Sequence, residues 1–194
     1  MKKVIIIGEG GHGKVIADIV RSSGDQLVGF LDDSLKPGAL GAVTDYEKYG
    51  DCWFIVGIGN AEIRERIVRS LSVRWYTAIH PSAVVSPSAS IGEGSVVMPN
   101  AVINAESVIG NHCIVNTGAI IEHNNTVCDY AHVSVGAKLG GTVKIGRASW
   151  IGIGSVINNN LSVCDGSTVG AGAVVVQDIT EPGVYVGIPA AKIH

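Results

Sequence analysis

The sequence predicts a small Rossmann-like α/β domain with a parallel sheet, followed by a parallel β-helix built from hexapeptide repeats. Two observations support this fold class. Residues 1–80 alternate short apolar runs with amphipathic stretches, as the strands and helices of a parallel sheet do. Residues 81–194 are dominated by a repeat of period six. The pair His80-Pro81 marks the predicted boundary, because the residue before a proline favours an extended conformation.

The N-terminal elements are predicted from apolar runs and turn residues. The apolar face of the first helix is predicted to contain Val15, Ile16, Ile19 and Val20. In the second helix, Arg64 is predicted either to contact a phosphate or to lie on a solvated face. The predicted order is a strand at 4–7, a helix ending near 24, a strand at 26–31, a turn at 32–38, a strand at 52–57, a helix capped by Asn60, and a strand at 73–79.

A glycine motif lies between the first strand and the first helix. The spacing Gly8-x-Gly10-x-x-Gly13 is typical of dinucleotide-binding turns, and Asp32 follows where such folds place an acid that binds ribose. Taken alone, the motif makes NAD a candidate ligand. About 80 residues are too few for the two nucleotide-binding halves of a full dinucleotide fold. We therefore expect one nucleotide, whose diphosphate lies at the helix N-terminus.

The second half reads in blocks of six from Ala83, among them SVIGNH, CIVNTG and AIIEHN. Position three is Ile, Leu or Val in all 16 blocks, and position one is Ala, Ser or Cys in 13 of them. These two positions face the same side of an extended segment and predict the interior of a triangular prism. Gly, Asn and Asp at the block ends suit its corners. Three blocks make one coil, so the array predicts about five coils. The apolar segment after Pro182-Gly183 is expected to cap the prism.

The amino-acid composition limits the kinds of partner and the cellular location that we expect. The 14 basic and 17 acidic residues give a net charge of −3, which does not favour nucleic acid or an anionic membrane surface. The apolar run from Val4 ends at Gly8 and is too short for a signal-peptide core or a membrane span. We expect a cytoplasmic protein without membrane insertion. The four cysteines are scattered without a CxxC pair, so no metal site is expected from them.

Two histidines of the array are candidates for acid-base chemistry. His123 is at a corner of the block AIIEHN, and His132 is at the outward second position of AHVSVG. Their separation of nine residues is half a coil, so they cannot stack on one chain, although they can approach across a subunit interface. From the residues alone, His123 can equally be a solvated corner residue and His132 an inter-subunit packing residue.

Several motifs together resemble a known family. The segments GEGGHGKV, FLDD, GIGNAEIR, IHPSAVVSPSA, EHNNTV, AHVSVGA and VYVGIPAAKI are similar to those of the NeuD/PglD-like sugar acyltransferases, and the likeness covers essentially the whole chain. This family includes sialic-acid O-acetyltransferases and N-acetyltransferases of UDP-linked 4-amino-sugars, and the latter are the nearer likeness. The resemblance implies a left-handed β-helix and a homotrimer that binds acetyl-CoA between neighbouring subunits. It also implies a role in bacillosamine-type or related surface glycan biosynthesis.

The resemblance also implies the roles of individual residues. It makes His123 the general base and the Gly141 amide an oxyanion donor, although Gly140-Gly141 can also be simply a tight corner. It places acetyl-CoA against His132, Ile153, Ala171 and Gly141. It places the nucleotide sugar against Gly10, Gly11, His12, Asp32, Asp33 and Gly59. His12 has an alternative role as a helix-capping residue.

One position departs from the family pattern. An acidic residue commonly follows the base in the nearest relatives, whereas Asn124 stands there in this chain. An amide can orient an imidazole ring but cannot stabilise an imidazolium by charge. Either Glu122 or a neighbouring chain then supplies a carboxylate, or the base is weaker.

The sequence allows three classes of function. The leading hypothesis is an acetyl-CoA-dependent N-acetyltransferase of a nucleotide-linked amino sugar, with O-acetylation of sialic acid or another sugar as its alternative. A second is a non-enzymatic NAD-binding module on a β-helical scaffold. A third is a zinc hydratase like the β-helical carbonic anhydrases, which His112, His123 and His132 argue against because they include no close histidine pair.

Overall fold

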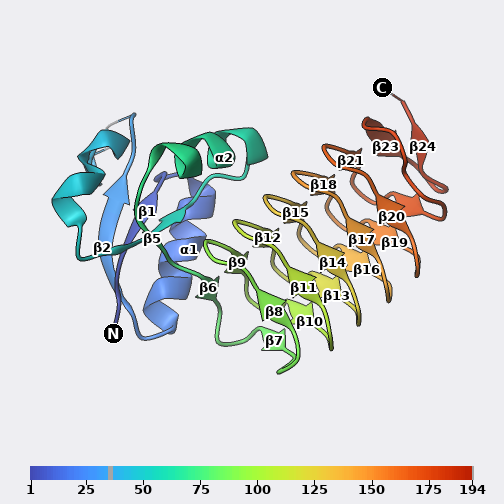
Figure 1. Ribbon diagram of the computed structural model, residues 1–194, viewed down its shortest axis with the longest axis horizontal. Coiled ribbons are helices and arrows are strands. Elements are labelled where there is room, and N and C mark those ends of the chain that lie inside the picture. The colour runs from blue at the N-terminus through green and yellow to red at the C-terminus, as the bar shows by residue number, and fades with distance from the viewer. Residues whose placement is uncertain (35–36, 194) are drawn as a thin grey trace.

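The computed structural model describes residues 1–34 and 37–193, and Figure 1 shows a small α/β domain at one end of a long β-solenoid. Leu35 and Lys36, in the middle of the predicted turn, lie outside the described residues. The α/β domain has a parallel sheet of order β3-β2-β1-β4-β5. Its elements are β1 (Lys3–Ile7), α1 (Gly11–Ser22), β2 (Gln26–Leu31), β3 (Ala39–Gly41), the 3-10 helix η1 (Val43–Tyr49), β4 (Trp53–Val56), α2 (Ala61–Ser70) and β5 (Arg74–Trp75).

The structure differs from the predicted elements at three places. The predicted strand at 73–79 is two strands, β5 and β6 (Ala78–Ile79), and β6 already pairs with β9 (Val96–Val97) of the solenoid. The sequence prediction also missed β3 and η1, because their segment is short and carries no apolar periodicity.

Two helix residues lie on faces other than those predicted. Val15 is exposed, because the stripe that packs against the sheet runs through Ile16, Ala17, Ile19 and Val20. Arg64 is not on a solvated face of α2 but is only 1% exposed. The predicted N-cap of α2 is confirmed, because the Asn60 side chain accepts a hydrogen bond from the Ile63 amide (2.9 Å).

The solenoid has three faces of parallel two-residue strands. The first face contains β6, β9, β12 (Ile114–Val115), β15 (His132–Val133), β18 (Trp150–Ile151) and β21 (Thr168–Val169). The second contains β7 (Val84–Val85), β10 (Val102–Ile103), β13 (Ile120–Ile121), β16 (Lys138–Leu139), β19 (Val156–Ile157) and β22 (Val174–Val175). The third contains β8 (Ser90–Ile91), β11 (Val108–Ile109), β14 (Thr126–Val127), β17 (Lys144–Ile145) and β20 (Ser162–Val163).

The hexapeptide pattern explains this prism. Position-three side chains such as Val115, Ile121 and Val133 are buried in one continuous core with the small position-one residues. The last residue of fourteen blocks has a positive φ, which is the conformation that turns the chain at each corner. Beyond the array, β23 (Val184–Val186) extends the first face and pairs with β24 (Ala191–Lys192), while Tyr185 packs on the end of the core.

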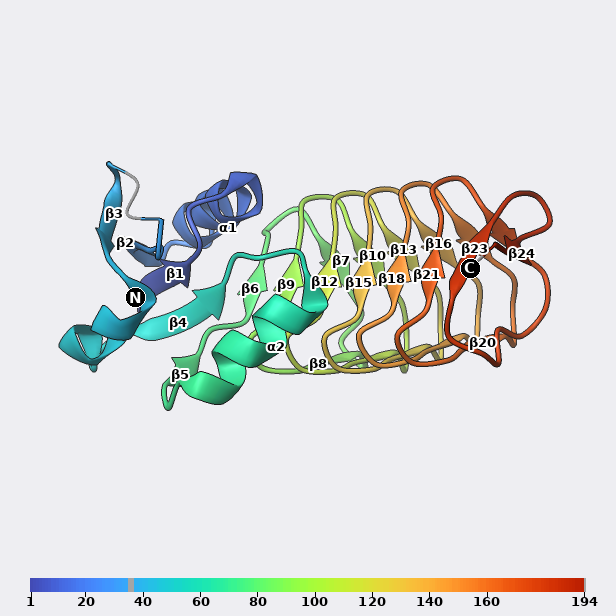
Figure 2. The ribbon, with the colours of Figure 1, turned by 90° about the horizontal axis from the view of Figure 1, so that it is seen from above.

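The two parts of the chain share a hydrophobic core. Ile16 and Ile19 of α1 pack with Val96, Met98 and Ile114 on the outer side of the first face. Figure 2 shows both helices close to the first coils. This packing holds the glycine turn at a fixed position relative to the solenoid. The division of the chain at residue 80 stays a prediction.

Candidate active site

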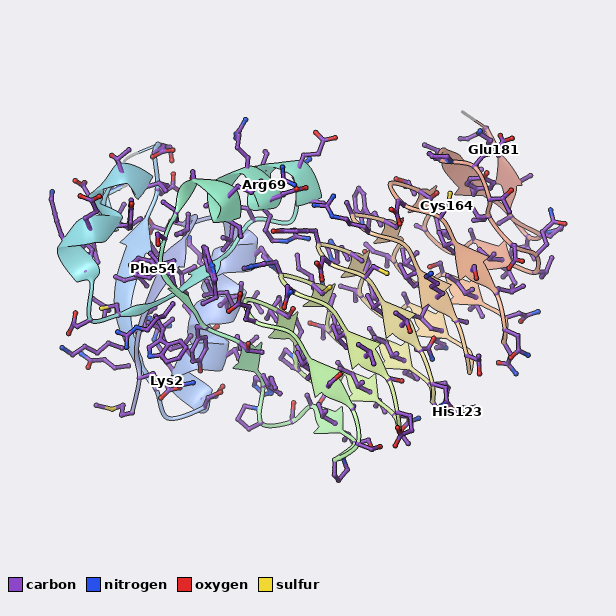
Figure 3. All side chains as sticks on the ribbon, viewed as in Figure 1. Lys2, Phe54, Arg69, His123, Cys164 and Glu181 are labelled. Atoms are coloured by element: carbon purple, nitrogen blue, oxygen red, sulfur yellow. The ribbon has the colours of Figure 1, made fainter. Side chains whose placement is uncertain are left out.

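His123 lies at an exposed corner between the second and third faces, in the turn that joins β13 to β14. Figure 3 shows it at the edge of the solenoid, away from the α/β domain. Its ring nitrogen Nδ1 is 2.9 Å from Oδ1 of Asn124. Asn124 is the corner residue with a φ of 58°, a conformation that asparagine tolerates better than most residues. The corner conformation therefore places the Asn124 side chain where its hydrogen bond orients the imidazole of His123.

The bond to Asn124 determines which ring nitrogen can act as a base. The amide oxygen of Asn124 is an acceptor, so Nδ1 of His123 carries the proton and Nε2 keeps its lone pair. In the described part of the chain, the Glu122 carboxylate makes no hydrogen bond to this ring; it is the Glu122 backbone oxygen that accepts bonds, from Ser107 and Asn125. Within one chain Asn124, and not Glu122, orients His123.

Gly141 lies one coil beyond His123 at the same corner. A Cβ added at Gly141 would be 2.6 Å from Cε1 and 2.7 Å from Nε2 of His123, so the imidazole occupies the space that a side chain would fill. The Gly141 amide donates to Oδ1 of Asn159 (3.0 Å). An oxyanion that accepts from this amide would therefore take the place of the Asn159 oxygen.

His132 lies on the first face, where it contacts one polar and one aromatic side chain. Its Nε2 is 3.0 Å from Nδ2 of Asn116, and its ring stacks on Trp150 with centroids 6.0 Å apart. The indole of Trp150 donates to Oγ of Ser134 (2.6 Å). Sequence reasoning missed Trp150, although it is the only tryptophan at an outward second position of a block. His132 is thus a fixed, partly buried side chain.

A cavity of about 540 Å³ lies between the N-terminal end of α2 and the first face. The N-terminal end of α2 lines one side with Gly59, Asn60 and Glu62, and the solenoid lines the other with His132 and Trp150. The predicted nucleotide-sugar residue Gly59 and the predicted acetyl-CoA residue His132 therefore face the same cavity.

The glycine turn is built as the motif predicts. Gly8 has a φ of 102°, and side-chain positions at Gly10 and Gly11 would open into free space. The backbone there can approach a ligand. His12 does not cap α1, whose N-cap is Gly10, and its buried Nε2 has no hydrogen-bond partner among the described residues.

The two aspartates after β2 line a second cavity, of about 500 Å³, at the carboxyl ends of β1 and β2. Asp32 accepts a hydrogen bond from the Glu9 amide (2.7 Å), and Asp33 accepts one from the Val43 amide (2.9 Å). Asp32 thereby ties the glycine turn to the next loop. This is the crevice in which open parallel sheets bind their ligands.

The predicted site residues form separate groups in one chain. His123, Asn124 and Gly141 share one corner, whereas Ile153 and Ala171 are exposed at the corner between the first and second faces. His12 and His132 are near each other at the junction between the α/β domain and the solenoid, since a charge on His12 would lower the pKa of His132.

Comparisons with known proteins identify the family and agree with the fold. The PglD N-terminal domain model matches residues 3–71. The acetyltransferase domain of PglB from Neisseria gonorrhoeae is 38% identical over 100% of both chains, with a TM-score of 0.95. The chain belongs to the NeuD/PglD-like family of sugar acyltransferases. Perosamine N-acetyltransferase from Caulobacter crescentus, solved as a histidine variant with CoA and GDP-perosamine, is 31% identical over 100% of this chain and 98% of that one, with a TM-score of 0.96.

A curated relative in this family is matched over part of its length. UDP-N-acetylbacillosamine N-acetyltransferase of Bacillus subtilis is 39% identical over an alignment of 111 residues that covers 50% of this chain and 51% of that protein. The match thus spans about half of the relative. The PglB domain has also been solved in complex with acetyl coenzyme A, at 35% identity and a TM-score of 0.93 over 99% of both chains.

The described residues contain neither a cluster of metal ligands nor a membrane-spanning helix. Residues 1–34 and 37–193 contain no group of three or more His, Cys, Asp or Glu side chains arranged to hold a metal ion. Among the same residues, neither helix has the length and apolar character needed to cross a bilayer.

Three histidines near the junction are held neutral. Burial is the first cause in each case and Arg64 adds to it, lowering the pKa of His12 to about 4 and that of His112 to about 4. Burial, His12 and Arg64 lower the pKa of His132 to about 3. His112 is the most enclosed of them, with its ring against Trp75. These side chains carry no charge near neutral pH.

The buried His112 predicts a pH dependence of stability. The unfolded chain binds a proton at His112 below about pH 6.5, whereas the folded chain does so only near pH 4. The free energy of unfolding should therefore decrease as the pH is lowered through this window, by about 1.4 kcal/mol per pH unit for this one group. His112→Asn removes the titration and tolerates the φ of 53°, so its curve should be flatter.

The measurement is urea unfolding of the wild type and His112→Asn at several pH values between 6 and 4.5. His80→Asn serves as the control, because the His80 ring bonds to the nearby Ser82. Parallel stability curves for the wild type and His112→Asn would contradict the neutral, buried state of His112.

Proposed function

We propose that this chain transfers an acetyl group from acetyl-CoA to the amino group of a nucleotide-linked sugar. The observation that carries the proposal is the arrangement at His123, whose Nδ1 is bonded to Asn124 while Nε2 faces the space over Gly141. A lone pair held in this way can take a proton from an attacking amine. Relatives that match the full chain were solved with acetyl-CoA, or with CoA and GDP-perosamine.

The proposed reaction uses His123 as the general base. Nε2 takes a proton from the amine as its nitrogen attacks the thioester carbonyl. The new carbon-nitrogen bond replaces the carbon-sulfur bond, and the CoA thiolate leaves with the proton returned by the imidazolium. The Gly141 amide stabilises the oxyanion when the carbonyl oxygen displaces Asn159.

The proposed binding residues lie on two parts of the fold. The diphosphate lies at the N-terminus of α1, and the nucleotide occupies the cavity after β2. The residues proposed for the nucleotide sugar are Gly10, Gly11, His12, Asp32, Asp33 and Gly59. Acetyl-CoA is proposed to contact His132, Ile153 and Ala171, two of which are exposed at one corner of neighbouring coils.

The site is complete only if two chains meet, and we propose a homotrimer. The outward side chains of the second face are mostly aliphatic, among them Val84, Val102 and Ile120. One edge of this face carries His123, and the other carries Ile153 and Ala171. If the second face lies against the threefold axis, each His123 edge meets the opposite edge of the next subunit. Light scattering that shows only monomer would contradict this assembly.

The proposed substrate class is supported by the relatives and by the glycine turn. The sugars of these relatives include a UDP-linked and a GDP-linked amino sugar, and both carry the diphosphate that the glycine turn suits. We propose a UDP-linked 4-amino-sugar, used in the biosynthesis of a bacillosamine-type or related surface glycan. The cytoplasm is the proposed location, since acetyl-CoA and nucleotide sugars are intracellular metabolites.

The test is a thiol-release assay with acetyl-CoA and a panel of UDP-linked amino sugars, GDP-linked amino sugars, sialic acid and free sugars. We expect turnover with a nucleotide-linked amino sugar and release of one CoA per acetylated amine. Turnover with sialic acid alone would favour O-acetylation. No turnover with any acceptor, together with NAD(H) binding in calorimetry, would replace the proposal by a non-enzymatic NAD-binding module.

A further inference from the structure

Arg64 is a buried cation that holds together three segments of the chain. It is in the first half of α2, and it is only 1% exposed. Its guanidinium donates through Nε to the carbonyl of His112 (2.8 Å) and through a terminal nitrogen to the carbonyls of Ile58 (2.9 Å) and Gly59 (3.0 Å). The other terminal nitrogen donates to the carbonyl of Tyr130.

Two of the four carbonyls belong to the loop before α2, and the other two belong to the solenoid. Ile58 and Gly59 form the loop that precedes α2 and lines the cavity opposite His132. His112 and Tyr130 are corner residues of consecutive coils, 18 residues apart, and both have a positive φ. Arg64 therefore ties the Gly59 loop directly to two coils of the solenoid.

The contacts of Arg64 are of a kind that lysine cannot reproduce. A guanidinium has five N–H donors in a rigid plane, whereas an ammonium concentrates three donors on one atom. In the described part of the chain, all of the hydrogen-bond partners of Arg64 are backbone carbonyls and none is a carboxylate. A carboxylate would be the expected partner if Arg64 were only a stabilising ion pair.

We propose that Arg64 is a positioning residue that sets the distance between the Gly59 loop and the solenoid, so that a sugar held by the loop reaches the acetyl group. This inference rests on the proposed function for its kinetic part. The neighbouring pair of Glu65 with Arg147 of the solenoid (2.5 Å) joins the same helix to the same corner through partly exposed side chains. It supplies a second, weaker contact, and Arg64 fixes the geometry.

The test compares Arg64→Lys with Arg69→Met in the assembled protein. Arg69 is on the same helix and is largely exposed, with Glu65 as its ion-pair partner. For Arg64→Lys we expect the KM for the nucleotide sugar to rise about tenfold or more, with the KM for acetyl-CoA within about twofold of the wild type. Arg69→Met should leave both KM values within about twofold of the wild type.

Hydrogen exchange gives a readout that needs no substrate. In Arg64→Lys the amides of residues 57–60 and of the corners at 112 and 130 should exchange faster, while β1 and β4 exchange as in the wild type. This result supports the positioning role even if the acetyltransferase assay fails. Wild-type exchange at these amides, or equal increases in both KM values with a uniform loss of protection, would overturn the proposal.

Discussion

Replacing His123 by alanine is expected to lower kcat by about 100-fold or more, which is the usual contribution of a general base. The reason is geometric. His123 is the side chain whose Nδ1 is oriented by Asn124 and whose Nε2 lies over Gly141. Because the residue is at an exposed corner, its loss should leave the fold intact, and the Tm should change little. The measurement is kcat by thiol release at saturating concentrations of both substrates.

The matched control is His80→Ala. His80 bonds to the neighbouring Ser82 and lies before the first complete block of the array. Its replacement should leave kcat within about twofold of the wild type, as for a surface position. If His123→Ala keeps a kcat near that of the wild type, His123 is not the base.

The second large effect is expected for Gly141→Ala. The new methyl group would be 2.6 Å from Cε1 of His123, so the ring must leave its position over the corner. A displacement of about 1 Å at a reacting group can cost about 100-fold in rate, and we expect kcat to fall between about tenfold and 100-fold. Gly141 is not among the glycines with a positive φ, so alanine should be accepted by the backbone.

Gly50→Ala separates this effect from a general loss of stability. Gly50 has a φ of −61°, and its nearest contact to an added Cβ would be the Glu47 carbonyl at 4.0 Å. Both variants should have a Tm close to that of the wild type, and only Gly141→Ala should lose kcat. Unchanged kcat in Gly141→Ala would show that the ring position over the corner is not the reactive one.

Much of the fold could be predicted because its repeats are local. In each block the aliphatic third residue and the small first residue face inward, and this alternation alone defines the prism. The corner conformations follow from the same pattern, with Asn124 as one example of a last residue at positive φ. The glycine turn was equally readable, because Gly8 and the open positions at Gly10 and Gly11 reflect local backbone geometry.

The contacts between the two parts of the chain could not be predicted in this way. Met98 and Ile114 occupy outward positions in their blocks, and their burial depends on α1, about 80 to 100 residues earlier in the chain. The polar pattern around Arg64 predicts a side chain exposed to solvent, yet Arg64 donates hydrogen bonds to corner carbonyls of the solenoid. His132 was predicted as a ligand residue, but nothing in its block indicates Asn116 or Trp150 as neighbours.

The central claim is that His123 of one chain acts on substrates held by another, and mixed assemblies test it most directly. His123→Ala and His132→Ala should each be nearly inactive alone. Co-expressed in equal amounts and purified through two different tags, they should form mixed trimers in which about one third of the sites combine an intact His123 with an intact His132 from the neighbouring chain. The account predicts recovery of about that fraction of wild-type kcat, whereas mixed trimers no more active than the separate variants would contradict a site shared between chains.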